Sequence, residues 1–258
     1  MPAEPVKFEN LFEGHEQIFE SCDCCKFDEP HPPRRLHIHV VEQDTNSAAW
    51  RQLNELIDEA ADDGREEFAP GVVMDRDDWM QIRTLPPTIA KLTAVKRLQL
   101  YGSNLVAVPP EIGEMSSLEN FMPYTSRRLH WFPFEITRCS ALRKSTVSTR
   151  CIYGNFKHRM PFPELLSVVP SGSVPKTCSI CNGPFSDAGP IQMWFSLWVA
   201  RDVLPLLVHA CSDDCIGTLH REPADHLVPA RCGGVDVPHR GGPELVQPAP
   251  YFSGGHRG

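Results

Sequence analysis

Apolar residues recur at a fixed interval in the middle of the chain. Three segments, starting at Ile82, Leu105 and Arg128, align with one another, and their matching positions are 23 and then 24 residues apart. The aligned positions are Leu85/Val108/Phe132, Pro86/Pro109/Pro133, Ile89/Ile112/Ile136, Leu92/Met115/Cys139, Val95/Leu118/Leu142, Leu98/Phe121/Ser145 and Leu100/Pro123/Val147. A period of this length predicts an architecture in which each repeat buries its apolar side chains against the next one.

These columns resemble the leucine-rich repeat family, in which a strand of the form LxxLxL is followed by a turn and then by LPxxIxxL. The resemblance covers about residues 82–156 and implies an α/β fold, a short leucine-rich-repeat solenoid with parallel strands on its concave side. Proline at the start of each Pro-x-x-Ile segment favours a short helical turn on the convex side. Two residues depart from the pattern, because Pro123 has no N–H for a strand and Ser145 places a hydroxyl at an apolar position.

The resemblance also predicts which side chains lie on the concave surface, between the column positions. They are Lys96, Arg97, Gln99, Tyr101, Glu119, Asn120, Met122, Tyr124, Arg143, Lys144, Thr146 and Ser148. We expect eight of them to bind a partner, namely Lys96, Arg97, Gln99, Tyr101, Glu119, Tyr124, Arg143 and Lys144. Basic and aromatic side chains on a rigid sheet suit an acidic protein or peptide. The alternative is a solvated face without a partner.

The open ends of three repeats need caps, and the flanking sequence predicts one of them. Trp50, Leu53 and Ile57 recur at helical spacing between Ser47, a good N-cap, and Gly64, a good helix stop. The apolar stripe of this helix predicts a capping role. We divide the chain into an acidic N-terminal α/β capping region (1–81), the repeats with their C-terminal flank (82–170), a small zinc-binding module (171–222) and a disordered Pro/Gly-rich tail (223–258).

Four cysteines in two pairs are the strongest chemical signal. Cys178 and Cys181 are separated by two residues, and Cys211 and Cys215 by three. Such pairs predict a structural, tetrahedral Zn²⁺ site with no open position for a substrate. The pairs resemble the halves of a treble-clef zinc finger, in which the last cysteine lies in the first turn of a helix. The predicted helix start at Ser212 is expected to lower the pKa of Cys215.

Other cysteines and histidines leave alternatives open. A second metal site is one of them, drawn from Cys22, Cys24, Cys25, His31, His37 and His39. Its spacing matches no ligand pattern, so exposed thiols are the other interpretation. His209 could replace a zinc ligand, although a position at the end of a strand is favoured. The apolar insertion between the cysteine pairs predicts strands that pack on the finger or on the last repeat, and Cys139 is expected in the core.

Charge narrows the range of partners. The chain has 258 residues and a net charge of −8, which disfavours binding to nucleic acid or anionic membranes through general charge attraction. The charge is uneven, since residues 1–81 carry −13, residues 82–170 carry +7 and residues 171–258 carry −2. The first region is therefore expected to lie against the second, and the alternative is two solvated surfaces that do not contact each other. With no membrane segment or export signal recognised, we expect a cytoplasmic protein with reduced cysteines.

Catalytic motifs are not found in the sequence, including GxSxG, GxxxxGK[ST], HExxH and GxGxxG. We therefore interpret the chain as a non-enzymatic scaffold that binds a protein partner of unknown identity. A zinc-finger protein that binds nucleic acid, with accessory repeats, is the main alternative. An enzyme with a reactive cysteine among Cys22, Cys24 and Cys25 is a third class.

Overall fold

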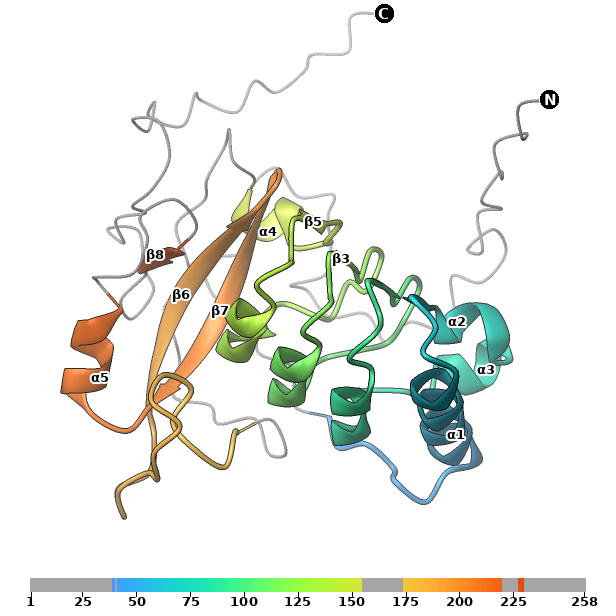
Figure 1. Cartoon of the computed structure of the whole chain (residues 1–258), viewed down its shortest axis with the longest axis horizontal. Coiled ribbons are helices and arrows are strands. Elements are labelled where there is room, and N and C mark those ends of the chain that lie inside the picture. Colours follow the sequence, from blue (N-terminus) through green and yellow to red (C-terminus); the bar gives the residue numbers. More distant parts are fainter. Residues whose placement is uncertain (1–38, 40, 155–173, 220–226, 230–258) are drawn as a thin grey trace, which may run out of the picture.

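The computed structural model of the chain describes residues 39, 41–154, 174–219 and 227–229. Figure 1 shows a row of short parallel strands, each preceded or followed by a short helix, with one long helix at the N-terminal end of the row and a long β-hairpin at the other end. The molecule is therefore a mixed α/β protein with two sheets.

Helix α1 (Ala48–Asp63) closes the N-terminal end of the row, as the sequence predicts. The Ser47 hydroxyl accepts a hydrogen bond from the Trp50 N–H, and Gly64 ends the helix with a φ of 64°. That angle lies in the left-handed region that glycine adopts without strain. Buried side chains on one side of α1, including Leu53 and Ile57, pack toward the 3-10 helix η2 (Pro87–Lys91).

The first sheet is parallel and has the strand order β1-β2-β3-β5. Its strands are β1 (Glu67–Phe68), β2 (Arg97–Gln99), β3 (Asn120–Met122) and β5 (Lys144–Ser145). Leu98 pairs with Phe121, and Phe121 pairs with Ser145, which is the alignment that the 23-residue period predicts. Strand β1 comes from the region assigned to the cap, and it extends the sheet by pairing Phe68 with Leu98.

Short 3-10 helices lie between these strands. Besides η2, they are η3 (Pro110–Glu114) and η4 (Phe134–Arg138). Each follows a proline in extended conformation, and each buries the isoleucine of its own segment, Ile89, Ile112 or Ile136. Because proline fixes φ near the helical value and has no backbone N–H to satisfy, it favours the entry to a helical turn.

The two departures from the apolar columns have physical explanations. Strand β3 ends at Met122, one residue before Pro123, so the missing N–H of the proline falls outside the ladder. The Ser145 hydroxyl donates to a carboxylate oxygen of Asp202 at 2.7 Å, and Asp202 also forms an ion pair with Arg150. Asp202 is fully buried, so this polar cluster joins the last parallel strand to the C-terminal hairpin.

The second sheet has the order β4-β7-β6-β8. Strands β6 (Ile191–Val199) and β7 (Asp202–Ala210) form the hairpin, and β7 pairs in parallel with β4 (Phe132–Pro133). The apolar insertion therefore packs on the last repeat segment, as predicted. Strand β8 (Leu227–Pro229) pairs with the other edge of β6. These three residues depart from the predicted disordered tail, because their extended backbone completes an otherwise open edge.

One hydrophobic core joins the two sheets. Phe121 contacts Phe132 edge to face at 5.4 Å between ring centroids, and Phe134 contacts Phe195 of β6 in the same way at 5.3 Å. The buried residues of this core run from Ala49 in α1 to Leu219 beyond β7. In the described part of the chain, we find no helix with the length and apolar character needed to cross a membrane.

Candidate metal centre and partner surface

The first cysteine pair lies in a tight knuckle before the hairpin. The Cys178 N–H donates to the Gly183 carbonyl at 2.8 Å, and the Asn182 N–H donates back to the Cys178 carbonyl at 3.0 Å. Asn182 has a φ of 60°, a left-handed conformation that asparagine tolerates better than most residues. The first cysteine pair therefore lies in a closed knuckle, with Asn182 as its left-handed residue.

The second pair follows strand β7 and begins helix α5 (Asp213–Thr218). The Ser212 hydroxyl accepts a hydrogen bond from the Cys215 N–H at 3.3 Å, so the predicted N-cap is confirmed. Two hydrogen bonds connect the end of β7 to the knuckle. The Ser179 N–H donates to the His209 carbonyl at 2.8 Å, and the His209 N–H donates to the Ser179 hydroxyl at 3.1 Å. The hairpin thereby brings together two cysteine pairs that are far apart in sequence.

The four cysteine sulfurs form one cluster. All four lie within 4.8 Å of one another, and Cys211 Sγ lies 3.6 Å from Cys181 Sγ and 3.5 Å from Cys215 Sγ. Four thiolates at about 2.3 Å from a tetrahedral Zn²⁺ would stand about 3.8 Å apart. The cluster can therefore hold a metal ion such as zinc. Cys178 is buried and Cys181 is exposed, so the cluster lies at the protein surface with Cys178 on its inner side.

The pKa values of the cysteine thiols are also consistent with binding of a cation. Burial opposes ionisation of Cys178, but hydrogen bonds from backbone N–H groups, including those of Ile180 and Cys211, lower its pKa to about 7. The neighbouring thiols of Cys211 and Cys181 raise the pKa of Cys215 to about 12. The expectation that the start of helix α5 lowers the pKa of Cys215 is therefore wrong for the thiols alone. The hydrogen bonds among the thiols raise this pKa by more than the N-terminus of one short helix lowers it. A divalent cation would favour all four thiolates together.

Helix η4 supports the knuckle from the repeat side. The Arg138 guanidinium donates to the Ser179 carbonyl at 3.1 Å and to the Asn182 side-chain oxygen at 2.6 Å. Glu135 lies in the same helix with 2% of its surface exposed, and neither of its carboxylate oxygens has a hydrogen-bond partner among the described residues. Burial raises the pKa of Glu135 above its ordinary value.

Replacing Glu135 with methionine is expected to stabilise the protein at neutral pH by about 1 kcal/mol, because an unsatisfied buried carboxylate becomes an apolar side chain of similar size. A raised pKa in the folded state means that the cost of ionised Glu135 is absent below the pKa of the unfolded chain, near 4.5, and grows as pH rises through the folded value. Urea unfolding of wild type and Glu135→Met at pH 5 and pH 8 measures this. If the gain in the free energy of unfolding is the same at pH 5 and pH 8, the buried Glu135 carboxylate is not its cause.

Among the residues that the structure describes, the other candidate ligands do not join the cluster. A ring nitrogen of His209 lies 3.1 Å from the Gln192 side-chain nitrogen, and burial lowers the pKa of this histidine to about 4. His209 is the penultimate residue of β7, as the favoured interpretation has it. Cys139 is buried, and its thiol donates to the Ile112 carbonyl at 3.2 Å. His39 contacts the ring of His130 at 4.8 Å between centroids. The remaining members of the second candidate metal site lie outside the described residues, namely Cys22, Cys24, Cys25, His31 and His37.

Five of the eight predicted partner residues line one hollow of about 320 Å³, and most of their charges are paired; they are Lys96, Arg97, Glu119, Arg143 and Lys144. The hollow also includes two glutamates of the N-terminal region, Glu66 and Glu67. Lys96 pairs with Glu66, and Arg97 pairs with Glu67 at 2.7 Å. The predicted contact between the acidic and basic regions is therefore confirmed at these residues. We call these paired residues, together with Glu119, Asn120, Arg143 and Lys144, the charged face.

Successive strands of the charged face alternate in charge. Arg143, directly before β5, pairs with Glu119, directly before β3, at 2.5 Å, and Glu119 also lies in the field of Lys96, directly before β2. The Arg143 guanidinium lowers the pKa of the Glu119 carboxyl. The Gln99 side chain donates to Glu67. The place of Glu66 and Glu67 beside the basic residues could not be predicted from the sequence, because the two-residue strand β1 has no periodic signal of its own.

Aromatic side chains lie at the other end of the same strands. Tyr101 and Tyr124 follow β2 and β3, and their ring centroids are 5.8 Å apart. The side chain of Tyr124 is exposed, with a relative exposure of 46%. The predicted partner set therefore divides into a charged part at the start of the strands and a tyrosine part beyond their ends.

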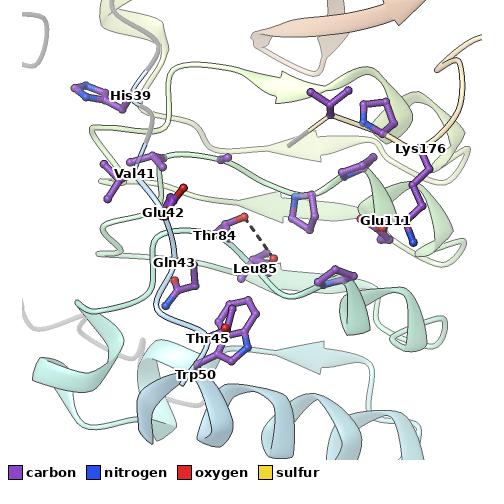
Figure 2. Close-up of a pocket in the computed structure, with 17 residues that line it drawn as sticks. His39, Val41, Glu42, Gln43, Thr45, Trp50, Thr84, Leu85, Glu111 and Lys176 are labelled. Atoms are coloured by element: carbon purple, nitrogen blue, oxygen red, sulfur yellow. Dashed lines mark hydrogen bonds between the residues drawn. The ribbon is translucent and has the colours of Figure 1, made fainter. Parts of the chain in front are cut away.

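A groove of about 440 Å³ lies on a different part of the surface (Figure 2). The extended segment 41–45 forms one wall, and Lys176 lies at the opposite end beside Glu111. The Gln43 side chain accepts a hydrogen bond from the Arg83 N–H at 2.6 Å, which holds that wall against the repeats. A mainly apolar groove of this size can accommodate a small molecule or a short peptide. Its walls are far apart in sequence, so local patterns could not predict it.

The structure thus brings the four predicted cysteines into one cluster and five of the eight predicted partner residues around one hollow. It adds Glu66 and Glu67 to that hollow, and it leaves His209 out of the cluster. No protein-family model matches the chain, and no curated protein matches it either.

Proposed function

We propose that the chain is a non-enzymatic protein-interaction module, built as a short leucine-rich-repeat solenoid that holds a protein partner on its concave side. A structural Zn²⁺ in a treble-clef-like unit closes its C-terminal end. The observation that carries the proposal is the register of Leu98, Phe121 and Ser145 on adjacent parallel strands. With these side chains buried, their neighbours on each strand face away from the core.

Alternation along each strand supports this assignment of faces. Phe121 is buried, whereas Asn120 and Met122 on either side of it are partly exposed. A strand directs successive side chains to opposite sides of its sheet, so Asn120 and Met122 belong to the concave side. Three adjacent strands repeat this arrangement, and together they provide a rigid surface on which contacts can be placed.

The ion pairs change how such a surface would recognise a partner. Lys96, Arg97 and Arg143 each already have a carboxylate partner, so a purely acidic peptide would have to compete for them. Such exposed pairs contribute little to stability and are readily exchanged. We therefore assign most of the binding energy to Tyr101 and Tyr124, and we assign orientation to the charged face.

The zinc site is assigned a structural role because four protein ligands leave no coordination position for a substrate. Its contacts run into the fold, since Arg138 of η4 holds the knuckle and β7 pairs with β4. Asp213 and Asp214 are exposed beside the cluster, and their charge would repel a phosphate backbone. This favours protein binding over the nucleic-acid alternative.

Photo-crosslinking from defined positions tests the proposal. We expect a photoreactive phenylalanine analogue at Met122 or Tyr124 of the full chain, expressed in its native host, to yield a discrete covalent adduct with a protein on illumination. Matched positions for comparison are Thr93 and Ser116, which are exposed in the turns after η2 and η3. We expect no adduct from these positions, because they do not lie on the concave side. Mass spectrometry of each adduct identifies the partner.

Two outcomes would contradict the proposal. Equal adducts from Thr93 and Met122 would show nonspecific contact, and adducts from Thr93 or Ser116 alone would place the partner elsewhere. Nucleic acid covalently attached at Met122 would support the alternative function. A thermal melt of each labelled chain serves as the folding control.

A further inference from the structure

Exposed apolar side chains gather at one edge of the parallel sheet. The large apolar residues that are exposed in the described part of the chain are Val72, Val73, Tyr124 and Ile191. Val72 and Val73 have relative exposures of 81% and 62%, and both belong to helix α2 (Pro70–Val73). Figure 1 shows α2 beside the parallel strands, at the opposite end of the row from the hairpin that begins with Ile191.

Packing joins these valines to the tyrosines. Gly71 lies so close to Trp79 that a Cβ on this glycine would come within 2.7 Å of the indole nitrogen. The same indole N–H donates to the Tyr101 carbonyl at 3.1 Å, and the Tyr101 ring contacts Tyr124. Helix α2 is therefore linked through Trp79 to the backbone at Tyr101, just beyond the end of β2. We call Val72, Val73, Tyr101 and Tyr124 the valine–tyrosine edge.

Carboxylates follow the valines directly. Residues 75–78 contain three aspartates and one arginine, and Asp75 and Asp77 are exposed. The Asp75 carboxylate accepts a hydrogen bond from the Asp77 N–H at 3.0 Å, so the first helical turn of α3 (Arg76–Trp79) holds it in place. An apolar edge with negative charge at its border is complementary to a surface that combines apolar and positively charged side chains.

We propose that the valine–tyrosine edge docks a basic amphipathic segment of the partner protein, in which large apolar side chains alternate with Lys or Arg. This inference rests on the proposed function, because Tyr101 and Tyr124 belong to both surfaces. It adds Val72 and Val73 to the binding site. It also reverses the sign of charge expected on the partner, since three of the four basic residues of the charged face, Lys96, Arg97 and Arg143, already have carboxylate partners.

Charge argues against two other occupants. Residues 1–38 of the chain contain eight acidic and four basic side chains, so this segment would be repelled by the carboxylates at 75–78. A second copy in a symmetric dimer would bring the same aspartates toward one another. A partner of opposite charge avoids both costs.

Selection from a displayed peptide library tests the partner class. A library of random 12-residue peptides is selected on the full, zinc-loaded chain, and enriched peptides are synthesised for fluorescence anisotropy. We expect enriched peptides to be positively charged with two or more large apolar residues. We expect Val72→Ser/Val73→Ser to weaken their binding about tenfold or more. The matched control is Ile191→Ser, which removes an exposed apolar side chain elsewhere and is expected to bind as wild type does. Thermal melts establish that each variant is folded.

The results separate this inference from the proposed function. Basic peptides that lose affinity in the valine variant support the inference. Peptides that bind through Met122 or Tyr124 but are unaffected by the valine variant overturn the inference and leave the proposed function standing. Peptide binding that depends on Val72 and Val73 but not on Met122 would contradict the proposed binding to the concave side and would support binding to the valine–tyrosine edge. Enrichment of acidic peptides, no enrichment at all, or a dimer that dissociates in the valine variant overturns the inference.

Discussion

Replacing Cys178 with serine is expected to reduce bound zinc from one ion per chain to none and to destabilise the C-terminal part of the fold. A serine hydroxyl is a poor zinc ligand, and three cysteines cannot complete a structural tetrahedral site. Binding of a metal at 1,000 times its Kd stabilises a folded state by about 4 kcal/mol, so the loss should be of this order at saturating zinc. Elemental analysis and urea unfolding of both proteins provide the two measurements.

Cys139→Ser is the matched control for this experiment. Cys139 is also a buried cysteine, but its thiol contacts the Ile112 carbonyl and lies outside the cluster. We expect this variant to keep its zinc, even though an altered core contact lowers its stability. Zinc retained by Cys178→Ser, or lost equally from both variants, would show that the four cysteines do not form the site.

The features predicted from sequence are those with local signals. Ser47 caps the start of helix α1 and Gly64 ends it, and Ser212 caps the start of α5. The alignment of Leu98 with Phe121 follows from a constant period, because equal chain lengths between strands return each strand to the same height. These features depend on residues close in sequence or on a regular repeat, and both are visible without a structure.

The features that were missed depend on pairing between distant segments. Strand β1 has two residues, yet its Glu67 and the preceding Glu66 convert a basic surface into one of alternating charge. The contact of β4 with β7 was predicted only as general packing of an apolar insertion, without a register. Ser145 shows the same difficulty. Its hydroxyl does not fit the apolar column, and the reason is its hydrogen bond to Asp202, which lies 57 residues later in the sequence.

The charged face also shows why residue type alone is a weak guide to a partner. Lysine and arginine on an exposed strand suggest an acidic ligand only if their charge is available. Here Arg97 and Arg143 have carboxylates at 2.7 and 2.5 Å. A variant with Glu67→Arg and Arg97→Glu would keep the ion pair but exchange the strands that carry its positive and negative charges. It therefore separates the effect of the charge order on partner binding from the effect of the pair on stability.

Asp202→Ala is expected to lower the free energy of unfolding by about 2 to 3 kcal/mol, because it removes the buried acceptor of Ser145 and the partner of Arg150. The loss should stay below the upper range for buried pairs, since the Arg150 side chain is 43% exposed and can turn to water. Urea unfolding measures the change. The control is Asp187→Ala, which removes an exposed carboxylate near the cysteine knuckle and should change stability by less than about 0.5 kcal/mol.

A double-mutant cycle determines whether the Asp202 effect passes through Ser145. Ser145→Ala alone removes one hydroxyl at the end of the parallel sheet, and the double variant removes both hydrogen-bonding groups. If the 2.7 Å hydrogen bond joins the last parallel strand to the hairpin, the two losses should fall short of additivity by about 1 kcal/mol. Strict additivity would mean that Asp202 acts through Arg150 alone. In that case the hairpin would be held to the repeats mainly by the pairing of β4 with β7 and by the aromatic contact of Phe134 with Phe195.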